Sequence, residues 1–360
     1  MRKLIDELQV DALLLLSRQN KYYCASLYSG SGYVLLTKKQ TMIMVDARYY
    51  QQMRERNQNS EVWLLDEKHT LAFYLQQFKK KQSLTKIAFE ETTIAYSDYK
   101  KLIKIQDIEW IGANVEKVRQ IKSENEIKRI QKAADIASLA YEHLLKFIKV
   151  GMSEREIENE LLYQMRKWGA DKESFDTVLV SGKRGALPHG KASNKRIEAF
   201  DFVTIDFGVR YKEYCCDITR TFAMSHHYSE ELRVIYDIVL TAQQKAIAMI
   251  RPGVKCSQID KIARTYIEKQ GYGNYFTHNL GHGIGIDCHE NPRLSPQDDT
   301  ILQKGMVVSV EPGIYIEGLG GVRIEDDILV GEDGAIVLTN APKEFYVIGD
   351  NENGYTKKIK

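Results

Sequence analysis

Two stretches of the sequence, VTIDFG (203–208) and CCDITR (215–220), each place one aspartate among apolar and β-branched residues. This composition is typical of a buried strand. A lone acidic residue in a strand usually faces solvent, where water hydrates its charge. Asp206 and Asp217 are harder to explain in that way, because burying an unpaired carboxylate costs several kcal/mol. If the two aspartates point inward, a positive charge must compensate them.

Two later stretches repeat the pattern with glutamates. SVEPG (309–313) contains Glu311, and VRIEDDI (322–328) contains Glu325. Two divalent metal ions would bring four positive charges, and the four strand carboxylates bring four negative ones. The sequence therefore predicts a site in which two metal ions balance four buried acids.

The sequence also offers a neutral nitrogen ligand, His282, in GHGIG (281–285). The neighbouring glycines allow the backbone to approach closely. Four carboxylates and one imidazole, with no thiolate, favour Mn²⁺, with Co²⁺ or Zn²⁺ as alternatives. Two such ions about 3.5–4 Å apart can activate water and polarise a carbonyl, which suits metal-assisted amide hydrolysis.

The motifs follow one another in the order IDFG, CDITRT, GHGIGIDCHE, SVEPGIY and GVRIEDD. This ordered set resembles the pita-bread metallopeptidases, which include methionine aminopeptidase, prolidase and Xaa-Pro aminopeptidase. The motifs cover about 190–330, and the segments before them extend the likeness over nearly the whole chain. The resemblance implies an α+β protein, with a creatinase-like, non-catalytic α/β domain at 1–118 and a pita-bread catalytic domain at 119–360.

The resemblance also implies a role for each ligand. Asp206 would bind one metal ion, and His282 and Glu311 would bind the other. Asp217 and Glu325 would bridge the two ions. Glu311 would in addition accept the proton of the attacking hydroxide.

Other family positions fall on histidines and an arginine. His189, in LPHG, would line the substrate site, and His278 and His289 would touch the substrate and the tetrahedral intermediate. Arg323 would orient the carboxylates near the metal ions. A histidine outside a metal site is more often a hydrogen-bonded or surface residue, and the family positions favour the functional interpretation here.

Three further residues are candidates for substrate binding. Phe175 and Tyr315 could line an apolar pocket for proline, although ordinary core packing is an equal alternative for both. Arg293, in HENPRLS, could bind the carboxylate of a dipeptide, or it could be a surface or structural residue.

The choice within the family lies between two enzymes. The segment DARYYQQ (46–52) and Val310 before Glu311 favour an Xaa-Pro aminopeptidase, which removes the first residue before a proline. The alternative is an Xaa-Pro dipeptidase (prolidase), in which Arg293 would be the carboxylate ligand. Chain length argues against methionine aminopeptidase. A non-catalytic peptide-binding relative would have lost metal ligands, whereas all five are present here.

The overall composition limits the partners. The chain has 360 residues, of which 51 are basic and 49 acidic, so its net charge of +2 gives no reason to expect nucleic acid or membrane as a partner. Five cysteines without a CxxC pair, and an N-terminus without a signal-length apolar run, predict a cytoplasmic protein. The family resemblance further implies a homodimer that acts on small peptides with proline in second position.

Hydrophobic periodicity and turn residues predict the main elements. Strands are expected at 32–37, 42–45 and 86–89. Helices are expected at 46–56, 119–149, 229–250 and 257–269, and a further helix after a Ser153–Glu156 capping box. The last six residues, YTKKIK (355–360), are expected to form a solvated tail.

Overall fold

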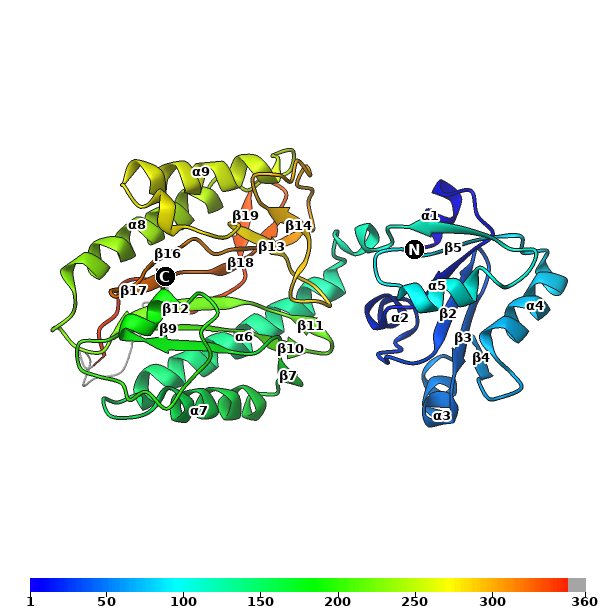
Figure 1. Ribbon diagram of the computed structural model, residues 1–360, viewed down its shortest axis with the longest axis horizontal. Coiled ribbons are helices and arrows are strands. Elements are labelled where there is room, and N and C mark those ends of the chain that lie inside the picture. Colours follow the sequence, from blue (N-terminus) through cyan, green and yellow to red (C-terminus); the bar gives the residue numbers. More distant parts are fainter. Residues whose placement is uncertain (349–360) are drawn as a thin grey trace. The chain divides into compact units, whose positions relative to one another are not determined.

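The computed structural model describes residues 1–348 and divides into two compact units, Met1–Val118 and Arg119–Lys360 (Figure 1). Each unit has a hydrophobic core of its own. Helices and strands are mixed in both units, which confirms the predicted α+β class. The predicted tail at 355–360 lies outside the described residues.

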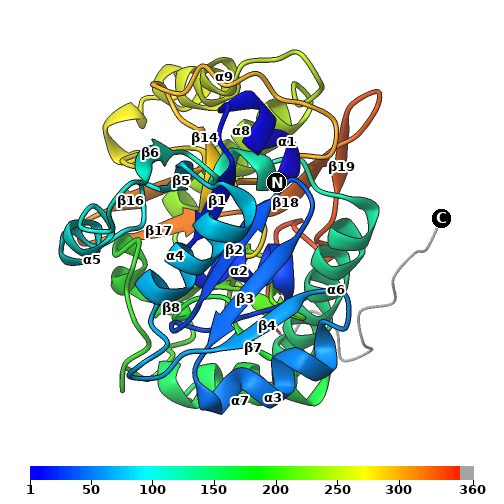
Figure 2. The same ribbon diagram turned by 90° about the vertical axis from the view of Figure 1, so that its right-hand side faces the viewer.

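One six-stranded sheet forms the centre of the first unit, in the order β4-β3-β2-β1-β5-β6 (Figure 2). Strand β2 is antiparallel to β1 and β3, whereas the other neighbouring pairs are parallel. The three strands expected from sequence agree with β2, β3 and β5 to within one residue at each end. The six strands are β1 (Ala12–Leu15), β2 (Tyr33–Thr37), β3 (Thr41–Val45), β4 (Glu61–Leu64), β5 (Lys86–Glu90) and β6 (Glu109–Ala113).

Helices cover both faces of this sheet, because Leu13 and Leu15 belong to one core cluster and Leu14 belongs to another. The side chain of Asp46 accepts a hydrogen bond from the first turn of α3, so Asp46 caps the predicted helix and does not form part of it. The helices are α1 (Arg2–Glu7), α2 (Arg18–Ala25), α3 (Ala47–Arg56), α4 (Leu71–Gln82) and α5 (Tyr96–Leu102), followed by the 3₁₀ turn η1 (Glu116–Arg119).

The second unit holds antiparallel strands in four short sheets, ordered β12-β9-β8, β14-β13-β15-β18-β19, β16-β17 and β11-β10-β7. The strands are β7 (Lys172–Glu173), β8 (Val178–Ser181), β9 (Phe202–Phe207), β10 (Val209–Tyr211), β11 (Tyr214–Cys215), β12 (Ile218–Ala223), β13 (Gly281–Gly283), β14 (Glu290–Leu294), β15 (Val307–Val310), β16 (Gly313–Ile316), β17 (Gly320–Arg323), β18 (Asp326–Val330) and β19 (Ala335–Val337).

Two helix pairs enclose these strands. Figure 1 shows α6 and α7 on one side of them and α8 and α9 on the other. Ile235, Val239 and Ile259 from α8 and α9 share a core with Val308 and Ile328 of the sheet. The helices are α6 (Glu124–Phe147), α7 (Glu154–Lys167), α8 (Glu230–Ile247) and α9 (Cys256–Lys269), with 3₁₀ turns η2 (Gly182–Ala186) and η3 (Gly273–Tyr275).

The long helix expected at 119–149 is shorter in the structure, where α6 spans Glu124–Phe147. Glu126 accepts hydrogen bonds from the backbone N–H and the hydroxyl of Ser123, at 2.9 and 2.7 Å, and this capping box fixes the start of the helix. The backbone N–H of Lys122 instead donates to the loop before β15. Local periodicity could not reveal a pairing between segments so distant in sequence.

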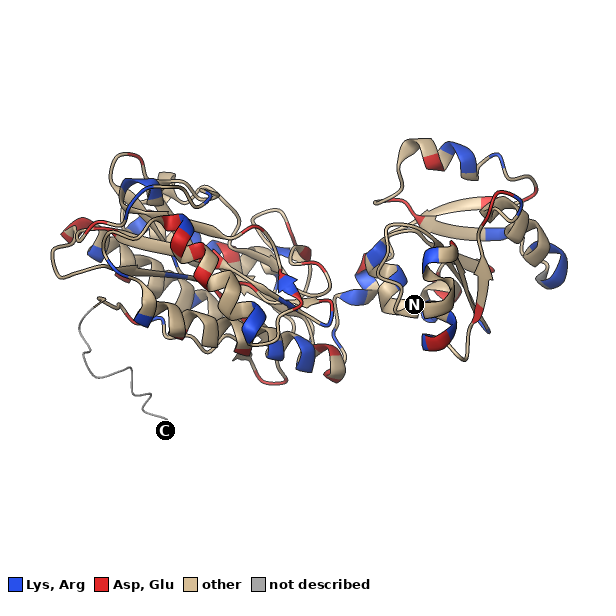
Figure 3. Ribbon diagram, turned by 90° about the horizontal axis from the view of Figure 1, so that it is seen from below, with Lys and Arg blue, Asp and Glu red and all other residues tan. Residues whose placement is uncertain are grey.

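Acidic and basic residues are interspersed along the chain in both units (Figure 3). This distribution agrees with the small net charge. Within residues 1–348, no helix combines the length and the apolar composition that crossing a bilayer requires.

Candidate active site

The five candidate metal ligands lie on neighbouring strands of the second unit. Asp206 is near the end of β9, and Asp217 immediately precedes β12, which pairs with β9. His282 is the central residue of β13, Glu311 follows β15, and Glu325 precedes β18. Strand β15 pairs with both β13 and β18, so the sheet brings the last three residues together.

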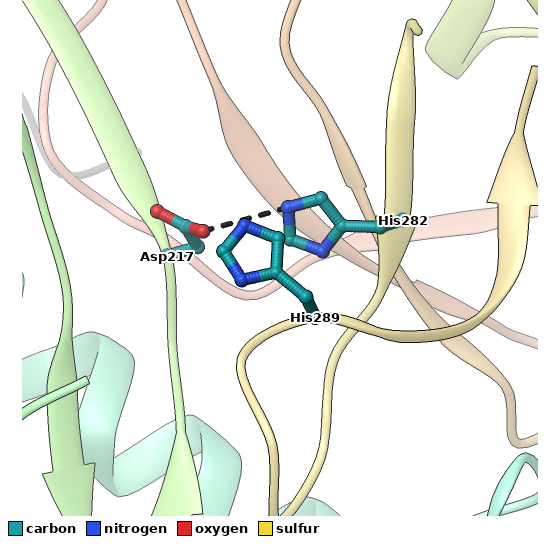
Figure 4. Close-up of side chains that lie close together, drawn as sticks. All are labelled: Asp217, His282 and His289. Atoms are coloured by element: carbon teal, nitrogen blue, oxygen red, sulfur yellow. Dashed lines mark ion pairs between the residues drawn. The ribbon is translucent and has the colours of Figure 1, made fainter. Parts of the chain in front are cut away.

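The side chains of these residues converge. His282 Nε2 lies 3.2 Å from Glu311 Oε1 and 3.7 Å from Asp217 Oδ2. Figure 4 shows His282 and His289 directed toward Asp217. Donor atoms within 4.8 Å of one another form three overlapping groups, which are Asp206, Asp217 and Glu325; His282, Glu311 and Glu325; and Asp217, His282 and His289.

The carboxylates of this cluster repel one another in a buried environment. Burial, together with the charges of Glu325 and Asp206, raises the pKa of Asp217 well above its ordinary value. Burial and the charge of Glu311 do the same to the pKa of Glu325. One oxygen each of Asp206, Asp217 and Glu325 is buried without a hydrogen-bond partner among the described residues. Unpartnered oxygens and mutual repulsion fit a site built for cations, and the oxygen and imidazole donors suit two divalent ions.

This repulsion predicts a pH dependence for the metal-free protein. Because the folded-state pKa values of Asp217 and Glu325 are raised, their contribution to stability is present below about pH 4, the ordinary carboxyl pKa, and is lost as pH rises. Thermal unfolding with chelator and with Mn²⁺, measured from pH 5 to 8, should show a difference in Tm that widens with pH. A difference that stays constant or narrows would contradict this account of the cluster.

Glu311 differs from the other acids. Burial opposes its ionisation, but the hydrogen bond and charge of His282 outweigh burial and lower the pKa of Glu311 to about 2. The hydroxyl of Ser309 donates to Glu311 Oε1 at 3.3 Å and accepts from the backbone N–H of His282 at 3.1 Å. A Cβ at Gly281 would lie 2.0 Å from the Ser309 carbonyl oxygen, so only glycine allows β13 this close to Ser309. Glu311 is therefore charged at neutral pH.

Arg323 connects several of the carboxylates. It donates from Nη2 to Asp206 Oδ2 at 2.5 Å, from Nε to Thr219 Oγ1 at 3.1 Å, and from Nη1 to the Tyr315 hydroxyl at 2.7 Å. Thr219 in turn donates to Glu325 Oε2 at 2.7 Å. Thr219 and Ser309 were not predicted as site residues, because their only signal in the sequence is a position two residues from a candidate ligand.

Tyr315, for which a proline pocket and ordinary core packing were the two alternatives, is buried beside Arg323. Its hydroxyl contacts Arg323 and also lies 2.9 Å from His278 Nε2, and burial raises the pKa of Tyr315 to about 12. It is not among the described residues that line the cavity next to the cluster. The ring stays in the interior because Arg323 and His278 both form hydrogen bonds with its hydroxyl.

A cavity of about 490 Å³ opens onto the cluster. Burial, and then the neighbouring His282, lower the pKa of His289 to about 4, so its imidazole is neutral at neutral pH. Asp176 and Lys191, which form an ion pair at 2.6 Å, also line the cavity and were not singled out from sequence. All five candidate ligands line it, together with the predicted residues His189, His278, His289, Phe175, Arg293 and Arg323.

Comparison with known proteins agrees with this geometry. Residues 128–332 match metallopeptidase family M24, and residues 1–121 match the creatinase/prolidase N-terminal domain. An Xaa-Pro dipeptidase of Pyrococcus horikoshii is 40% identical over 95% of this chain and 96% of its own length.

Solved structures show the same likeness. An Xaa-Pro dipeptidase from Bacillus anthracis is 44% identical, with a TM-score of 0.91 over 96% of this chain and 97% of that one. An X-Pro aminopeptidase from Thermotoga maritima is 36% identical, with a TM-score of 0.89 over 96% and 98%. These findings confirm the predicted resemblance to pita-bread metallopeptidases. The chain belongs to metallopeptidase family M24, and its catalytic domain follows a creatinase/prolidase N-terminal domain.

Proposed function

We propose that this protein is an Xaa-Pro dipeptidase, which hydrolyses the bond between the first residue and the proline of a dipeptide. The sequence motifs favoured an Xaa-Pro aminopeptidase, with the dipeptidase as the alternative. The alternative now has the better support, because the relatives from two Pyrococcus species and the Bacillus anthracis structure all carry the name dipeptidase or prolidase.

The observation that carries this proposal is the position of Arg293. Its half-buried side chain lines the same cavity as the candidate metal ligands. No carboxylate among the described residues forms an ion pair with its guanidinium, whereas Lys191 in the same cavity is paired with Asp176. An arginine that faces a cavity without a partner suits a substrate carboxylate, which it can bind through two parallel hydrogen bonds. A dipeptide ending in proline supplies that carboxylate beside the scissile bond.

Two divalent ions are part of the proposal, with Mn²⁺ the first candidate. Asp206 would hold one ion, His282 and Glu311 would hold the other, and Asp217 and Glu325 would be shared. When bound, such a pair of ions supplies activated water at neutral pH and polarises the scissile carbonyl. The buried, unpartnered carboxylate oxygens support this assignment.

The side chains around the cavity would handle the substrate and the protons. Glu311, ionised at neutral pH, would accept a proton from the attacking water and deliver it to the proline nitrogen. An amide nitrogen must gain a proton to depart as an amine, and the proline nitrogen, which has no N–H in the peptide, leaves as a secondary amine. His289, neutral at this pH, would donate its N–H to the scissile carbonyl oxygen. His278 and His189 would contact the rest of the peptide, with Phe175 against the proline ring.

Replacing Arg293 by methionine tests the carboxylate assignment. A charge-assisted hydrogen bond contributes about 1.5–3 kcal/mol, so kcat/KM for an Xaa-Pro dipeptide should fall by about 10–100-fold. Hydrolysis of the matching Xaa-Pro amide, which lacks the carboxylate, should change little. The exposed Arg251→Met serves as the control. An equal loss on both substrates would show that Arg293 has a structural role.

The substrate class, the oligomeric state and the location remain predictions. Small peptides with proline in second position are the proposed substrates. A homodimer and a cytoplasmic location stay predictions from the sequence.

A further inference from the structure

A buried ion cluster adjoins His289. The next residue, Glu290, begins β14 and is not among the described residues that line the cavity. Its Oε1 lies 3.1 Å from Arg119 Nη1, and its Oε2 lies 3.4 Å from Lys122 Nζ. Arg119, Lys122 and Glu290 are only 4%, 5% and 7% exposed. Three charged residues are thus buried together directly behind a predicted substrate-contacting histidine.

The Glu290 carboxylate also holds the loop between β13 and β14. Its Oε1 accepts the backbone N–H of Asp287 at 3.1 Å, and the Asp287 carboxylate lies 3.8 Å from Arg119 Nη2. A Cβ at Gly285 would lie 2.5 Å from Glu290 Oε2, so the carboxylate packs directly on the loop backbone. The other side of the loop is fixed by the hydrogen bond from Cys215 N to the Gly285 carbonyl, at 2.8 Å.

Two side chains extend from this loop into the active site. The ring of His289 has its centroid 4.3 Å from that of His282. The thiol of Cys288 donates to Asp217 Oδ2 at 3.2 Å. A shift of the loop by about 1 Å would misplace His289 relative to a bound substrate, and misplacements of that size can cost about 100-fold in rate.

The charges of the cluster balance, with two cations (Arg119 and Lys122) and two anions (Glu290 and Asp287). Such a buried cluster is weak evidence for stability, because well-packed apolar residues often support a fold equally well. Its value lies in the two hydrogen bonds that fix the Glu290 carboxylate, from Lys122 Nζ and from the backbone N–H of Asp287, with Arg119 adding charge. We propose that Glu290, held by Arg119 and Lys122, is a positioning residue that sets the place of His289.

Arg119 is the first residue of the second unit. The residues proposed to hold Glu290, and through it His289, therefore lie at the start of the second unit. The inference rests on the proposed function in one respect, which is that His289 touches the substrate.

The first test is Glu290→Gln, which keeps the size of the side chain and removes its charge. We expect kcat for an Xaa-Pro dipeptide to fall by about 10–100-fold, as for other residues that orient site groups from behind. KM should stay near its wild-type value, because Arg293 does not belong to the cluster. Glu290→Gln leaves Arg119 and Lys122 facing a single anion. The double variant Lys122→Met/Glu290→Gln restores the balance, and it should recover the wild-type Tm but not kcat.

A double-mutant cycle with His289→Ala separates positioning from general support of the fold. If Glu290 acts through His289, Glu290→Gln should lower kcat in the wild type and have little further effect in His289→Ala. Lys195→Met is the matched control, because Lys195 pairs with the buried Asp201 at 2.6 Å and neither residue lines the cavity. It should lower Tm and leave kcat unchanged.

Any one of the following results would overturn the inference. The charge-balanced variant could have the wild-type kcat, the effects of Glu290→Gln and His289→Ala could add in full, or Lys195→Met could lower kcat as much as Glu290→Gln does. If His289→Ala leaves kcat unchanged, the proposed role of His289 fails and the inference fails with it. If His289→Ala lowers kcat and Glu290→Gln does not, only the inference fails.

Discussion

Replacing Glu311 by glutamine is expected to lower kcat for an Xaa-Pro dipeptide by about 10²–10⁴-fold, the usual contribution of a positioned general base. Glutamine has nearly the same shape, and its amide oxygen can still accept the hydrogen bond from Ser309. It cannot take up a proton at neutral pH. The wild-type carboxylate is ionised, because the hydrogen bond and charge of His282 lower its pKa to about 2, and an ionised carboxylate has an oxygen free to accept the proton.

The assay should use saturating Mn²⁺, because Glu311 is also a proposed metal ligand and glutamine binds metal more weakly. Glu317→Gln is the control, since Glu317 is exposed and lies six residues further along the chain. Equal activity of Glu311→Gln and the wild type at saturating metal would remove Glu311 from the proposed chemistry.

Replacing Asp217 by asparagine is expected to separate stability from function. In the metal-free protein, Asp217 is a buried carboxylate whose pKa is raised by burial and by Glu325 and Asp206. Asparagine removes one of these repelling charges and can still accept the hydrogen bond from Cys288. The metal-free variant should therefore be more stable than the metal-free wild type at pH 8.

The same variant should lose the response to metal. A metal ion present at about 1,000 times its Kd stabilises a folded protein by about 4 kcal/mol. Most of this stabilisation should be lost when Asp217, which both ions are proposed to share, is replaced, and activity should be lost with it. Thermal unfolding with EDTA and with Mn²⁺ measures both effects, and the exposed Asp333→Asn serves as the control. An unchanged Mn²⁺-dependent rise in Tm would show that Asp217 holds no metal ion.

The sequence was informative about the candidate ligands because the four acids lie in strand-like motifs and His282 lies in a glycine-rich one. It was much less informative about the residues that hydrogen-bond to these ligands and hold them in place. Thr219 and Ser309 are ordinary polar residues whose hydrogen bonds to Glu325 and Glu311 depend on the pairing of strands. The contact of Arg119 with Glu290 joins segments far apart in the chain, which no local pattern can reveal.

The run Glu325-Asp326-Asp327 shows the same limit on a small scale. Asp326 forms ion pairs with Arg220 at 2.7 Å and with Lys343 at 2.5 Å. Asp327 Oδ2 accepts the backbone N–H of Asp217 at 2.8 Å. Three consecutive acids thus have three different environments. They are distinguished only by the direction in which each side chain points in the folded protein.

The preference for an aminopeptidase also came from local identities, the segment 46–52 and Val310. The dipeptidase proposal depends on where Arg293 lies relative to the cavity and on whether another carboxylate pairs with it. Neither property can be derived from the order of residues.

The most direct test compares an Xaa-Pro dipeptide with an Xaa-Pro-Xaa tripeptide as substrates of the Mn²⁺-loaded protein, with release of the free first residue measured with and without chelator. We expect cleavage of the dipeptide, loss of that cleavage with chelator, and much weaker cleavage of the tripeptide. Efficient cleavage of the tripeptide would restore the aminopeptidase alternative. Failure to cleave either peptide in a metal-dependent way would contradict the proposed function as a whole.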